Sequence, residues 1–366
     1  MADKMTHQER VVASLKDEPV DRLTTYPIAC GVSRRTVGDG TMLYRDWATD
    51  PKKFAAGFIQ GQKTFDLDFT IGLMDLSVIA GDFGAHVRMD EQNTPFVDVP
   101  VIKSTEDYEK LQMPDPSKGR SGVIVEGTRL FSEALKTETI TSGFLEGPLL
   151  SLTQCAGAEK VLMDLYNNPS AVHKALAVFT EYLREMVKRM GTAKPNACMW
   201  DYLWGSYSCL GDKEYHEFEG QHKYAGGLNE LVRKEGMALA IHNCADLPHM
   251  DSQVKEMKPD VYTMAYYPLI PGSPSAKVCI EKGYADNCVL CGTIDPQGYV
   301  RWSKEKMEKV TMDLCHEVST ALCARGLKSK YCIASNCEVP PGVSIKLENI
   351  KAQVDAVKKY GQVVCK

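Results

Sequence analysis

A histidine and a cysteine stand two residues apart at His242 and Cys244, in the stretch IHNCADL, and another cysteine, Cys337, follows much later in the chain. Imidazole nitrogen and thiolate sulfur are ligands that zinc prefers, and three protein ligands leave a fourth position open for water or substrate. Cysteine is also among the residue types most often buried as plain packing, and this chain has 13 of them. A catalytic zinc site therefore requires a fold that brings Cys337 to the other two residues.

Cys288 and Cys291 have the C-x2-C spacing of zinc and redox sites. No second pair in the sequence completes a four-ligand set with them. We therefore interpret these two cysteines as packing residues.

Carboxylates and a tyrosine follow other apolar runs. Asp75 and Asp201 fall at or just beyond the ends of such runs. A carboxylate in that place can act as acid, base, metal ligand or hydrogen-bond acceptor, or it can cap a helix. Asp295 precedes Pro296, which is typical of a helix start, so we interpret Asp295 as a cap. Tyr266 is a candidate cofactor-binding residue at the mouth of the fold, with packing at the rim as the alternative.

The elements that must position these residues alternate between strand-like and helix-like segments. Such alternation predicts βαβ units with a parallel sheet, and a count of eight strands favours a closed (β/α)8 TIM barrel over a doubly wound sheet. The eight apolar or β-branched runs are 23–30, 68–74, 139–145, 196–203, 239–244, 260–266, 289–295 and 331–337. The carboxyl ends of barrel strands meet at one face, and residues two apart on a strand share a side. We therefore expect His242, Cys244 and Cys337 to converge at the barrel mouth.

Capping signals predict several helix boundaries. The pairs that open and close helices are Thr6 with Glu9 as a capping box, Pro169 with Gly191 at the two ends of one helix, and Ser303 with Gly326 at the two ends of another. A last helix is predicted over 347–360. No composition break or repeat requires a second domain, so we expect residues 1–366 to form a single TIM-barrel domain with an N-terminal helical segment. The Pro- and Asp-rich stretch 84–117 is predicted to be an excursion from it.

Composition excludes several classes of function. The formal charge is −5, the pI is near 6.0, and no basic stretch carries interleaved aromatic residues, so we expect neither nucleic-acid nor membrane-surface binding. The charged N-terminus lacks the apolar core of a secretory signal, and no apolar run is long enough to span a bilayer. We therefore expect a cytoplasmic protein whose cysteines are mostly buried and reduced, which is compatible with an anaerobic host.

Four long motifs together resemble the uroporphyrinogen decarboxylase superfamily, over about residues 9–361. They are HQERVVASLKDEPVDRL, FLEGPLLSLTQCAGAEKVLMDLYNNPSAVHKAL, LCGTIDPQGYVRWSKEKMEKV and ASNCEVPPGVSIKLENIKAQVDAVKKYG. The resemblance implies a (β/α)8 barrel. Asp75 matches a catalytic aspartate of the decarboxylase branch. However, Arg34 and Arg35 correspond only weakly to the arginine-rich segment of that branch. A decarboxylase-like lyase is therefore the second alternative function.

The chain is more similar to the corrinoid-dependent methyltransferase branch, which includes methylcobalamin:coenzyme M methyltransferases. That resemblance implies zinc held by His242, Cys244 and Cys337, and a methylcorrinoid carried by a partner corrinoid protein. The expected reaction moves a methyl group between the corrinoid protein and a small acceptor, either a coenzyme M-like thiol or tetrahydrofolate. The first alternative passes a methyl group from a methyl ether or similar donor to a Co(I) corrinoid protein. Either reaction belongs to one-carbon metabolism.

Two departures from that branch concern the metal shell. Ala245 stands where the family usually has glycine after the first cysteine. The stretch TMAYYPL, at the expected end of the sixth strand, lacks the acidic residue that many relatives carry there. The fourth zinc position is then open to Asp75, Asp201, Tyr266, water or the substrate.

Overall fold

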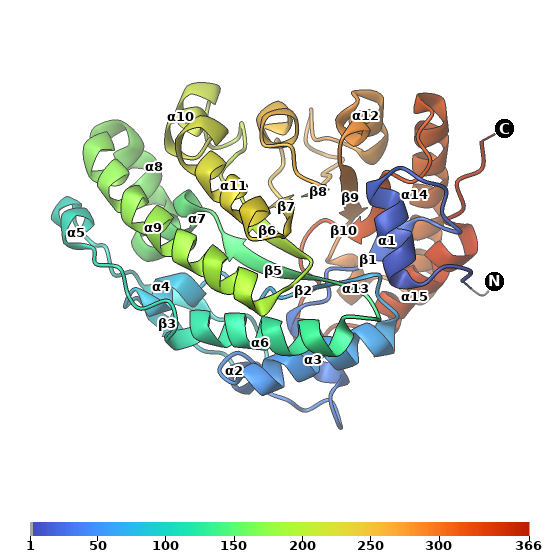
Figure 1. Cartoon of the computed structure of the whole chain (residues 1–366), viewed down its shortest axis with the longest axis horizontal. Helices are drawn as coiled ribbons and strands as arrows, with labels where there is room; N and C mark the ends of the chain where they lie inside the picture. Colours follow the sequence, from blue (N-terminus) through green and yellow to red (C-terminus); the bar gives the residue numbers. More distant parts are fainter. Residues whose placement is uncertain (1–2, 366) are drawn as a thin grey trace.

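Eight parallel strands form one sheet that curves into a nearly closed barrel (Figure 1). The structure is a computed structural model that describes residues 3–365. The order of strands around the sheet is β1-β10-β9-β8-β7-β6-β5-β2. Their bounds are β1 (Thr24–Tyr26), β2 (Phe69–Ile71), β5 (Ile140–Glu146), β6 (Ala197–Asp201), β7 (Ala238–Asn243), β8 (Val261–Met264), β9 (Val289–Ile294) and β10 (Tyr331–Ser335). The predicted α/β class, the TIM barrel and all eight predicted strands are confirmed.

The two end strands of this sheet, β1 and β2, are joined by side chains. The Ile71 N–H donates to the Tyr26 hydroxyl at 3.3 Å, and the Thr25 N–H donates to Asp68 Oδ2 at 2.8 Å. These bonds satisfy backbone groups that a strand at the edge of a sheet would otherwise leave unpaired.

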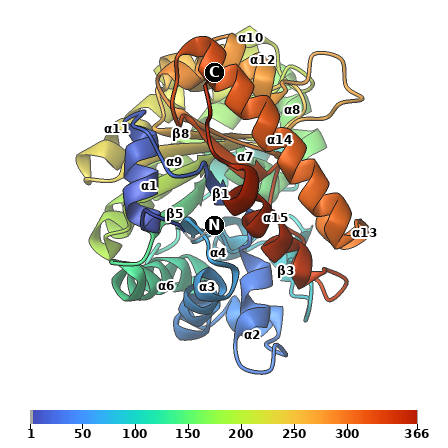
Figure 2. The ribbon, with the colours of Figure 1, turned by 90° about the vertical axis from the view of Figure 1, so that its right-hand side faces the viewer.

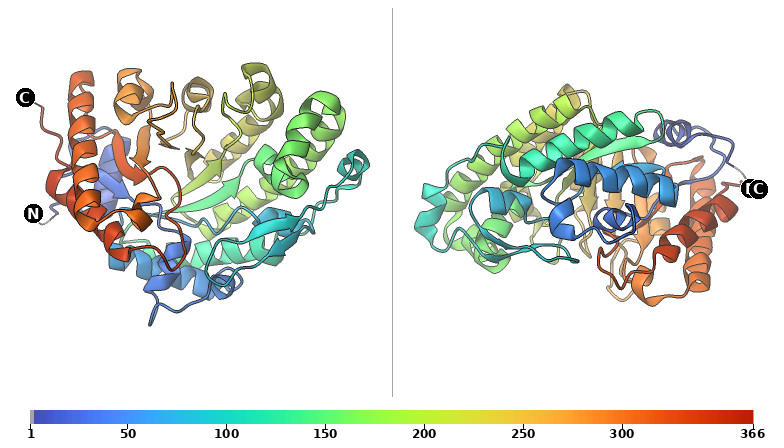
Figure 3. Two further views of the ribbon diagram at one scale, coloured as in Figure 1. Left: turned by 180° about the vertical axis from the view of Figure 1, so that it is seen from behind. Right: turned by 90° about the horizontal axis from the view of Figure 1, so that it is seen from below.

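Helices cover the outside of the barrel. The longer ones are α3 (Pro51–Phe65), α6 (Gly119–Leu135), α9 (Pro169–Ala193), α11 (Gly226–Lys234), α14 (Lys304–Arg325) and α15 (Leu347–Tyr360). The shorter ones are α1 (His7–Leu15), α2 (Tyr44–Trp47), α4 (Val78–Asp82), α5 (Thr105–Lys110), α7 (Pro148–Ala156), α8 (Ala158–Asn167), α10 (Asp212–Phe218), α12 (Ala276–Glu281) and α13 (Gly298–Arg301). Helices α3, α6 and α9 lie side by side, blue to green in Figures 1 and 3. Their apolar faces bury the sheet on that side of the molecule.

Most predicted helix boundaries are confirmed. In the capping box of α1, the Thr6 N–H donates to Glu9 Oε2 at 2.8 Å and the Glu9 N–H donates to Thr6 Oγ1 at 3.2 Å. Ser303 caps the start of α14, and Gly326 ends it in the left-handed conformation at φ 71°. Helix α15 spans the predicted residues.

The prediction that Gly191 ends a helix is wrong. Helix α9 continues to Ala193 and ends at Lys194, which takes the left-handed conformation at φ 57°. A Cβ atom at position 191 would lie 2.8 Å from Glu235 Oε2. The glycine is therefore required by a close approach to a neighbouring segment and not by a helix end.

Helix α1 lies beside β1 at the amino-terminal end of the barrel, which we call the floor (Figure 2). Asp68, which is fully buried, accepts hydrogen bonds there from Arg10 Nη1 at 2.8 Å and Arg22 Nη1 at 2.7 Å. His7 Nδ1 lies 2.8 Å from the same carboxylate. Several cations thus surround the buried carboxylate, so its charge is compensated.

The predicted excursion over 84–117 is confirmed. It contains the antiparallel pair β3 (His86–Arg88) and β4 (Phe96–Val99), and α5, which packs against α9. In Figure 1 this segment lies at the lower left, away from the barrel sheet. Thr94, between β3 and β4, reaches back to the barrel mouth and lines the cavity described below.

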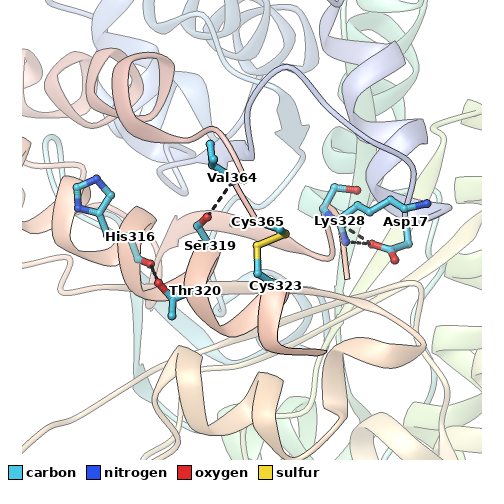
Figure 4. The surroundings of a disulfide bond; sticks show 9 residues. Asp17, His316, Ser319, Thr320, Cys323, Lys328, Val364 and Cys365 are labelled. Atoms are coloured by element: carbon cyan, nitrogen blue, oxygen red, sulfur yellow. Dashed lines mark hydrogen bonds between the residues drawn. A yellow bond between two sulfur atoms is a disulfide. The ribbon is translucent and has the colours of Figure 1, made fainter. Parts of the chain in front are cut away.

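One disulfide was not expected from the sequence. Cys323 on α14 is bonded to Cys365 near the end of the chain (Figure 4). Eight of the eleven free cysteines are buried, as expected, and they include Cys288 and Cys291. Within residues 3–365, no helix is both long enough and apolar enough to cross a membrane.

Candidate metal centre

Three soft ligands converge at the carboxyl end of the barrel, as predicted. His242 is on β7, Cys244 follows this strand, and Cys337 follows β10. One ligand atom from each residue lies within 4.8 Å of the other two. In a tetrahedral zinc site, metal–ligand bonds of about 2.0–2.3 Å place the ligand atoms roughly 3.5 Å apart, so small side-chain adjustments accommodate the ion. The residues present fit zinc in both ligand type and spacing.

Asn243 explains how the two ligands beside it come to face inward. Its side chain points to the opposite side of the strand, where Nδ2 donates to the carbonyl of Tyr202 at 3.0 Å. Its Oδ1 accepts the N–H of Ala245 at 2.9 Å. Because the buried amide holds both the strand end and the following turn, His242 and Cys244 are left on the barrel side.

Cys337 is positioned by the residues that precede it. Ser335 Oγ donates to the Cys337 carbonyl at 2.7 Å and accepts the N–H of Ile28 at 2.9 Å. The Asn336 side chain forms two hydrogen bonds with the backbone of Tyr266, through its N–H at 3.1 Å and its carbonyl at 3.2 Å. These contacts tie the turn after β10 to its neighbours on both sides.

Tyr266, the predicted cofactor-binding residue, is held near the metal centre by its backbone, but it is not among the residues that line the cavity there. Its neighbour Tyr267 is closer to the ligands, because its hydroxyl donates to the Cys244 carbonyl at 2.8 Å. A role for the Tyr266 side chain stays a prediction.

A threonine orients the histidine. Thr263 on β8 pairs in register with His242, and its hydroxyl is hydrogen-bonded to Nδ1 of the imidazole. This bond leaves Nε2 free for a metal, which is the usual way in which an outer contact fixes a histidine ligand. Thr263 begins the stretch TMAYYPL, so this stretch supplies an orienting hydroxyl where an acid was expected.

The ligands perturb one another's protonation. The Cys244 thiol donates to Cys337, which together with the nearby His242 holds the pKa of Cys337 well below its usual range against the effect of burial. The pKa of Cys244 is correspondingly raised by this bond and by burial. Burial opposes protonation of His242, but Cys337 and Asp201 outweigh it and raise the histidine pKa. The three residues thus interact through shared protons and charge. A bound metal ion would displace these protons, because it takes cysteine as thiolate and histidine as neutral imidazole.

Asp75 lies in the cavity wall and is engaged by protein groups. Its Oδ1 accepts from the Ser77 N–H at 2.9 Å and from the Ser77 hydroxyl at 2.6 Å. Its Oδ2 forms an ion pair with Arg120. Asp75 thus holds the turn before α4, but the N-cap of that helix is Ser77, so the capping interpretation of Asp75 is wrong and its role in the site stays a prediction.

Asp201 is the last residue of β6 and stands in register beside His242 on β7. Its side chain is buried, and Oδ1 has no hydrogen-bond partner. Burial raises its pKa to about 7, with Cys337 adding to the rise and His242 opposing it. The carboxyl is therefore free to interact with whatever enters the cavity.

Two further acids escaped the sequence analysis. Glu146, the last residue of β5, pairs in register with Asp201, and burial with the nearby Asp201 and Asp75 raises its pKa well above the usual range. Glu338 directly follows Cys337 and accepts the Gly31 N–H at 2.7 Å. Its place away from bulk solvent raises its pKa to about 8. The signal that singled out Asp75 and Asp201, an acid at the end of an apolar run, was present for both.

A cavity of about 160 Å³ lies beside the triad. Its walls are mostly apolar and also include the three ligands and three acids. The lining residues are Ile28, Ile71, Leu73, Asp75, Leu76, Thr94, Phe144, Met199, Asp201, Leu203, His242, Cys244, Cys337 and Glu338. Sites of this composition, apolar with a few convergent polar groups, are typical of small-molecule pockets.

The arginines of the N-terminal segment do not reach this cavity. Arg34 Nη1 donates to the carbonyls of Gly31 and Pro341 at 2.9 and 2.7 Å, and Nη2 donates to Gln92. Arg35 donates to the Gly342 carbonyl at 3.1 Å. Both guanidinium groups hold loops together, so they offer no clamp for the carboxylates of a porphyrinogen.

Fold and site together define a (β/α)8-barrel protein with a His-Cys-Cys triad at the barrel mouth that could hold a metal ion. The chain belongs to the uroporphyrinogen decarboxylase (URO-D) family, whose model matches residues 6–360. This match confirms the resemblance drawn from the sequence motifs.

Relatives carry the names of both branches. Methylcobamide:CoM methyltransferase MtbA of Methanosarcina acetivorans is 24% identical over 247 residues, which are 66% of this chain and 70% of the relative. Uroporphyrinogen decarboxylase of Campylobacter jejuni is 27% identical over 179 residues, 47% of this chain and 51% of the relative. Among solved structures, a methyltransferase from Methanosarcina mazei superposes with a TM-score of 0.78 at 18% identity, covering 98% of this chain and 99% of that one. The proteins so named are enzymes, and the structural likeness supports the fold.

Proposed function

We propose that the protein is a zinc-dependent methyltransferase that moves a methyl group between a corrinoid protein and a small molecule. The observation that carries this proposal is the convergence of His242, Cys244 and Cys337 within 4.8 Å at the barrel mouth, next to a cavity. A relative named for methyl transfer from a methylcobamide to CoM adds support. The engagement of Arg34 by loop carbonyls argues against the decarboxylase-like alternative.

Zinc bound by this triad would bind the thiol of an acceptor and lower its pKa, or would act as a Lewis acid toward the oxygen of a methylated donor. The other steps fall to the chain's own residues. Thr263 keeps the imidazole of His242 turned toward the ligand position. The apolar walls exclude water from the reacting methyl group.

Fewer candidates remain for the fourth zinc ligand than the sequence analysis left open. Asp75 already forms an ion pair with Arg120, and Tyr266 does not line the cavity. Asp201 lines the cavity, and its Oδ1 has no hydrogen-bond partner. We assign to Asp201 the role of accepting a hydrogen bond from the bound small molecule, which leaves the fourth position to water or to that molecule.

The acceptor in the leading form of this proposal is a coenzyme M-like thiol or tetrahydrofolate, and the methylcorrinoid is presented by a separate corrinoid protein at the mouth. The second candidate runs in the other direction, from a methyl ether or similar donor to a Co(I) corrinoid. There the carbon–oxygen bond breaks, the methyl group bonds to cobalt, and the released alkoxide takes up a proton. Asp201 favours this candidate, because burial raises the pKa of its carboxyl to about 7 and the protonated form can give its proton to the departing alkoxide oxygen.

Metal analysis tests the proposal most directly. We expect about one zinc per chain in the purified protein and almost none in His242→Ala or Cys337→Ala. Cys209→Ala is the matched control, because Cys209 is an exposed cysteine outside the triad, and it keeps full zinc. A protein without zinc, or triad variants with full zinc, would contradict the mechanism.

Absorbance assays then assign the direction of transfer. Loss of the methylcobalamin spectrum with a thiol or tetrahydrofolate present supports an acceptor-side enzyme. Gain of that spectrum from cob(I)alamin with a methyl ether supports the donor-side enzyme.

A further inference from the structure

The cavity beside the triad has acidic walls, and among residues 3–365 its one basic side chain is the proposed zinc ligand His242. Three of the side chains that line it are acids, namely Asp75, Asp201 and Glu338. Within residues 3–365, no lysine or arginine is among the residues that line it. With His242 bound to zinc as a neutral imidazole, a ligand inside this cavity therefore meets negative or neutral polar groups.

The nearest guanidinium group is already used. Arg120 forms an ion pair with Asp75, and its Nη1 donates to the Ser77 hydroxyl at 3.1 Å. It neutralises one acid and leaves Asp201 and Glu338 without a cation on the cavity wall. A zinc ion held by two thiolates and a neutral imidazole has a formal charge of zero, so the proposed metal centre adds no net positive charge either.

Among residues 3–365, an anionic group would find no lysine or arginine on the cavity wall to compensate its charge. The rest of the wall is largely apolar, with Leu73, Phe144 and Leu203 among its members. Moving an anion from water into such surroundings costs free energy unless a cation or hydrogen-bond donors replace the lost water. An uncharged methyl-bearing group does not incur that cost.

The carboxyl group of Asp201, in the cavity wall, lacks a hydrogen-bond partner on one oxygen. Asp201 is 4% exposed, its Oδ1 has no hydrogen-bond partner, and it lines the cavity beside His242. Buried polar atoms in native proteins are nearly always paired, so an unpaired carboxyl oxygen on a residue that lines a cavity points to a ligand that supplies the donor or the positive charge.

A second cavity shows how far an apolar ligand can extend. It has a volume of about 250 Å³, is lined mainly by apolar side chains of the barrel interior, and shares Ile28, Ile71 and Met199 with the wall of the first cavity. Met199 is unbranched and flexible, so rotation of its side chain can open the upper cavity toward the lower one. An apolar substituent on the ligand has room to extend down the barrel.

We propose that the small molecule whose methyl group is exchanged enters this cavity as an uncharged or cationic group with an apolar body, bound beside Asp201, and that sulfonates and carboxylates are excluded from it. This inference rests on the proposed methyl transfer and selects the substrate class within it. It favours a neutral or cationic methyl donor or thiol over a coenzyme M-like sulfonate.

Three two-carbon thiols of equal length test the inference on the zinc-loaded protein. They are cysteamine, 2-mercaptoethanol and 2-mercaptoethanesulfonate, which carry positive, zero and negative charge beyond the thiol. By isothermal titration calorimetry we expect the sulfonate to bind at least tenfold more weakly than 2-mercaptoethanol, and cysteamine to bind most tightly. Asp201→Asn should reduce the preference for cysteamine over 2-mercaptoethanol severalfold. Because the wild-type protein and Asp201→Asn are compared with the same thiols, differences in thiol pKa cancel. The change in preference then reports the effect of the Asp201 charge on the cavity wall.

A second set of probes removes the dependence on zinc. Phenyltrimethylammonium, anisole and benzenesulfonate are titrated into metal-stripped protein and followed by ligand-detected NMR. We expect the first two to bind and benzenesulfonate to bind at least tenfold more weakly. If that order holds but purified protein contains no zinc, the proposed function fails and the charge selection stands. If zinc and methyl transfer are found but the sulfonates bind as tightly as the neutral probes, the charge selection is overturned and the function stands.

Discussion

The two ends of the barrel treat buried charge in opposite ways. At the floor, the fully buried Asp68 is surrounded by Arg10, Arg22 and His7. At the mouth, Asp201 is almost as deeply buried, yet one of its oxygens has no partner. An unpaired buried polar group costs about 1–3 kcal/mol in stability. The fold therefore accepts this cost for Asp201 at the mouth, whereas it avoids the cost for Asp68 at the floor by pairing it. The comparison supports the proposal that the mouth binds a ligand while the floor stabilises the barrel, a division that is general for this architecture.

The largest effect is expected from removing a ligand at the mouth. Cys337→Ala should weaken zinc binding by more than about 100-fold, since loss of a direct ligand exceeds the 10–100-fold effect of an outer contact. Methyl transfer should fall at least in proportion, while the thermal midpoint of metal-free protein changes little. Zinc content and the initial rate of methyl transfer measure these effects. A large loss of stability in the metal-free variant would show that the mouth also stabilises the fold.

At the floor, Asp68→Ala should produce the opposite pattern. It leaves two buried arginines without their shared carboxylate, which should cost about 3–5 kcal/mol in the free energy of unfolding. Zinc per folded chain should stay at the wild-type value. Urea denaturation followed by circular dichroism measures the loss.

Asp46→Ala is the control for this floor variant, because Asp46 forms only exposed ion pairs, with Lys53 at 3.3 Å and with Arg45 at 4.0 Å. Its removal should cost at most about 1 kcal/mol. Equal losses for the two variants would contradict the assignment of the floor as the stabilising end.

A smaller effect at the mouth is expected from the hydroxyl that orients the histidine. Thr263→Val keeps the side-chain shape but removes the hydrogen bond to His242 Nδ1, so zinc affinity should fall by about 10- to 100-fold. Competition with a chelator of known zinc affinity measures the change. Thr311→Val is the control, because the Thr311 hydroxyl donates only to the Met307 carbonyl in its own helix at 2.9 Å, and it should leave zinc affinity unchanged.

The smallest effect is a pH dependence at the floor. Hydrogen bonds and charge attraction from Asp66 and Asp68 outweigh burial and raise the pKa of His7 from 6.5 to about 9. The stabilisation from protonated His7 is complete below pH 6.5, declines as pH rises from 6.5 to about 9, and is lost above that. His7→Asn should therefore lower the free energy of unfolding by about 1 kcal/mol at pH 6 and by much less at pH 9.

Thermal unfolding of both proteins across this pH range checks the His7 prediction. His316→Asn is the control, because the His316 ring packs edge-on against Tyr360 and its replacement should give no such trend. A difference for His7→Asn that grows with pH would contradict the sign.

The sequence was sufficient to predict the barrel and the triad, because both depend on local patterns. Each strand is a short apolar run, and the ligands fall at or after strand ends, where barrel topology brings distant residues together. His242 and Cys337 could therefore be placed at one mouth without knowing any contact between them. That residues 1–366 form a single domain stays a prediction.

What the sequence could not predict depends on contacts between distant segments. Arg120 pairs with Asp75 from another helix, and no local signal marks that pairing. Tyr266 was predicted to be the last residue of the sixth strand, at the mouth, but β8 ends at Met264, so the alternation of sides no longer applies at Tyr266. Gly191 was assigned to a helix end because the approach of Glu235 is visible only in three dimensions.

The bond between Cys323 and Cys365 has a topological consequence. It closes a covalent ring that contains β10, the proposed metal ligand Cys337 and all of α15. A single cut in the backbone between Cys337 and α15 would thus leave both pieces attached to the same molecule. As long as the bond is oxidised, the segment that supplies the third ligand stays connected to α14 through both of its ends.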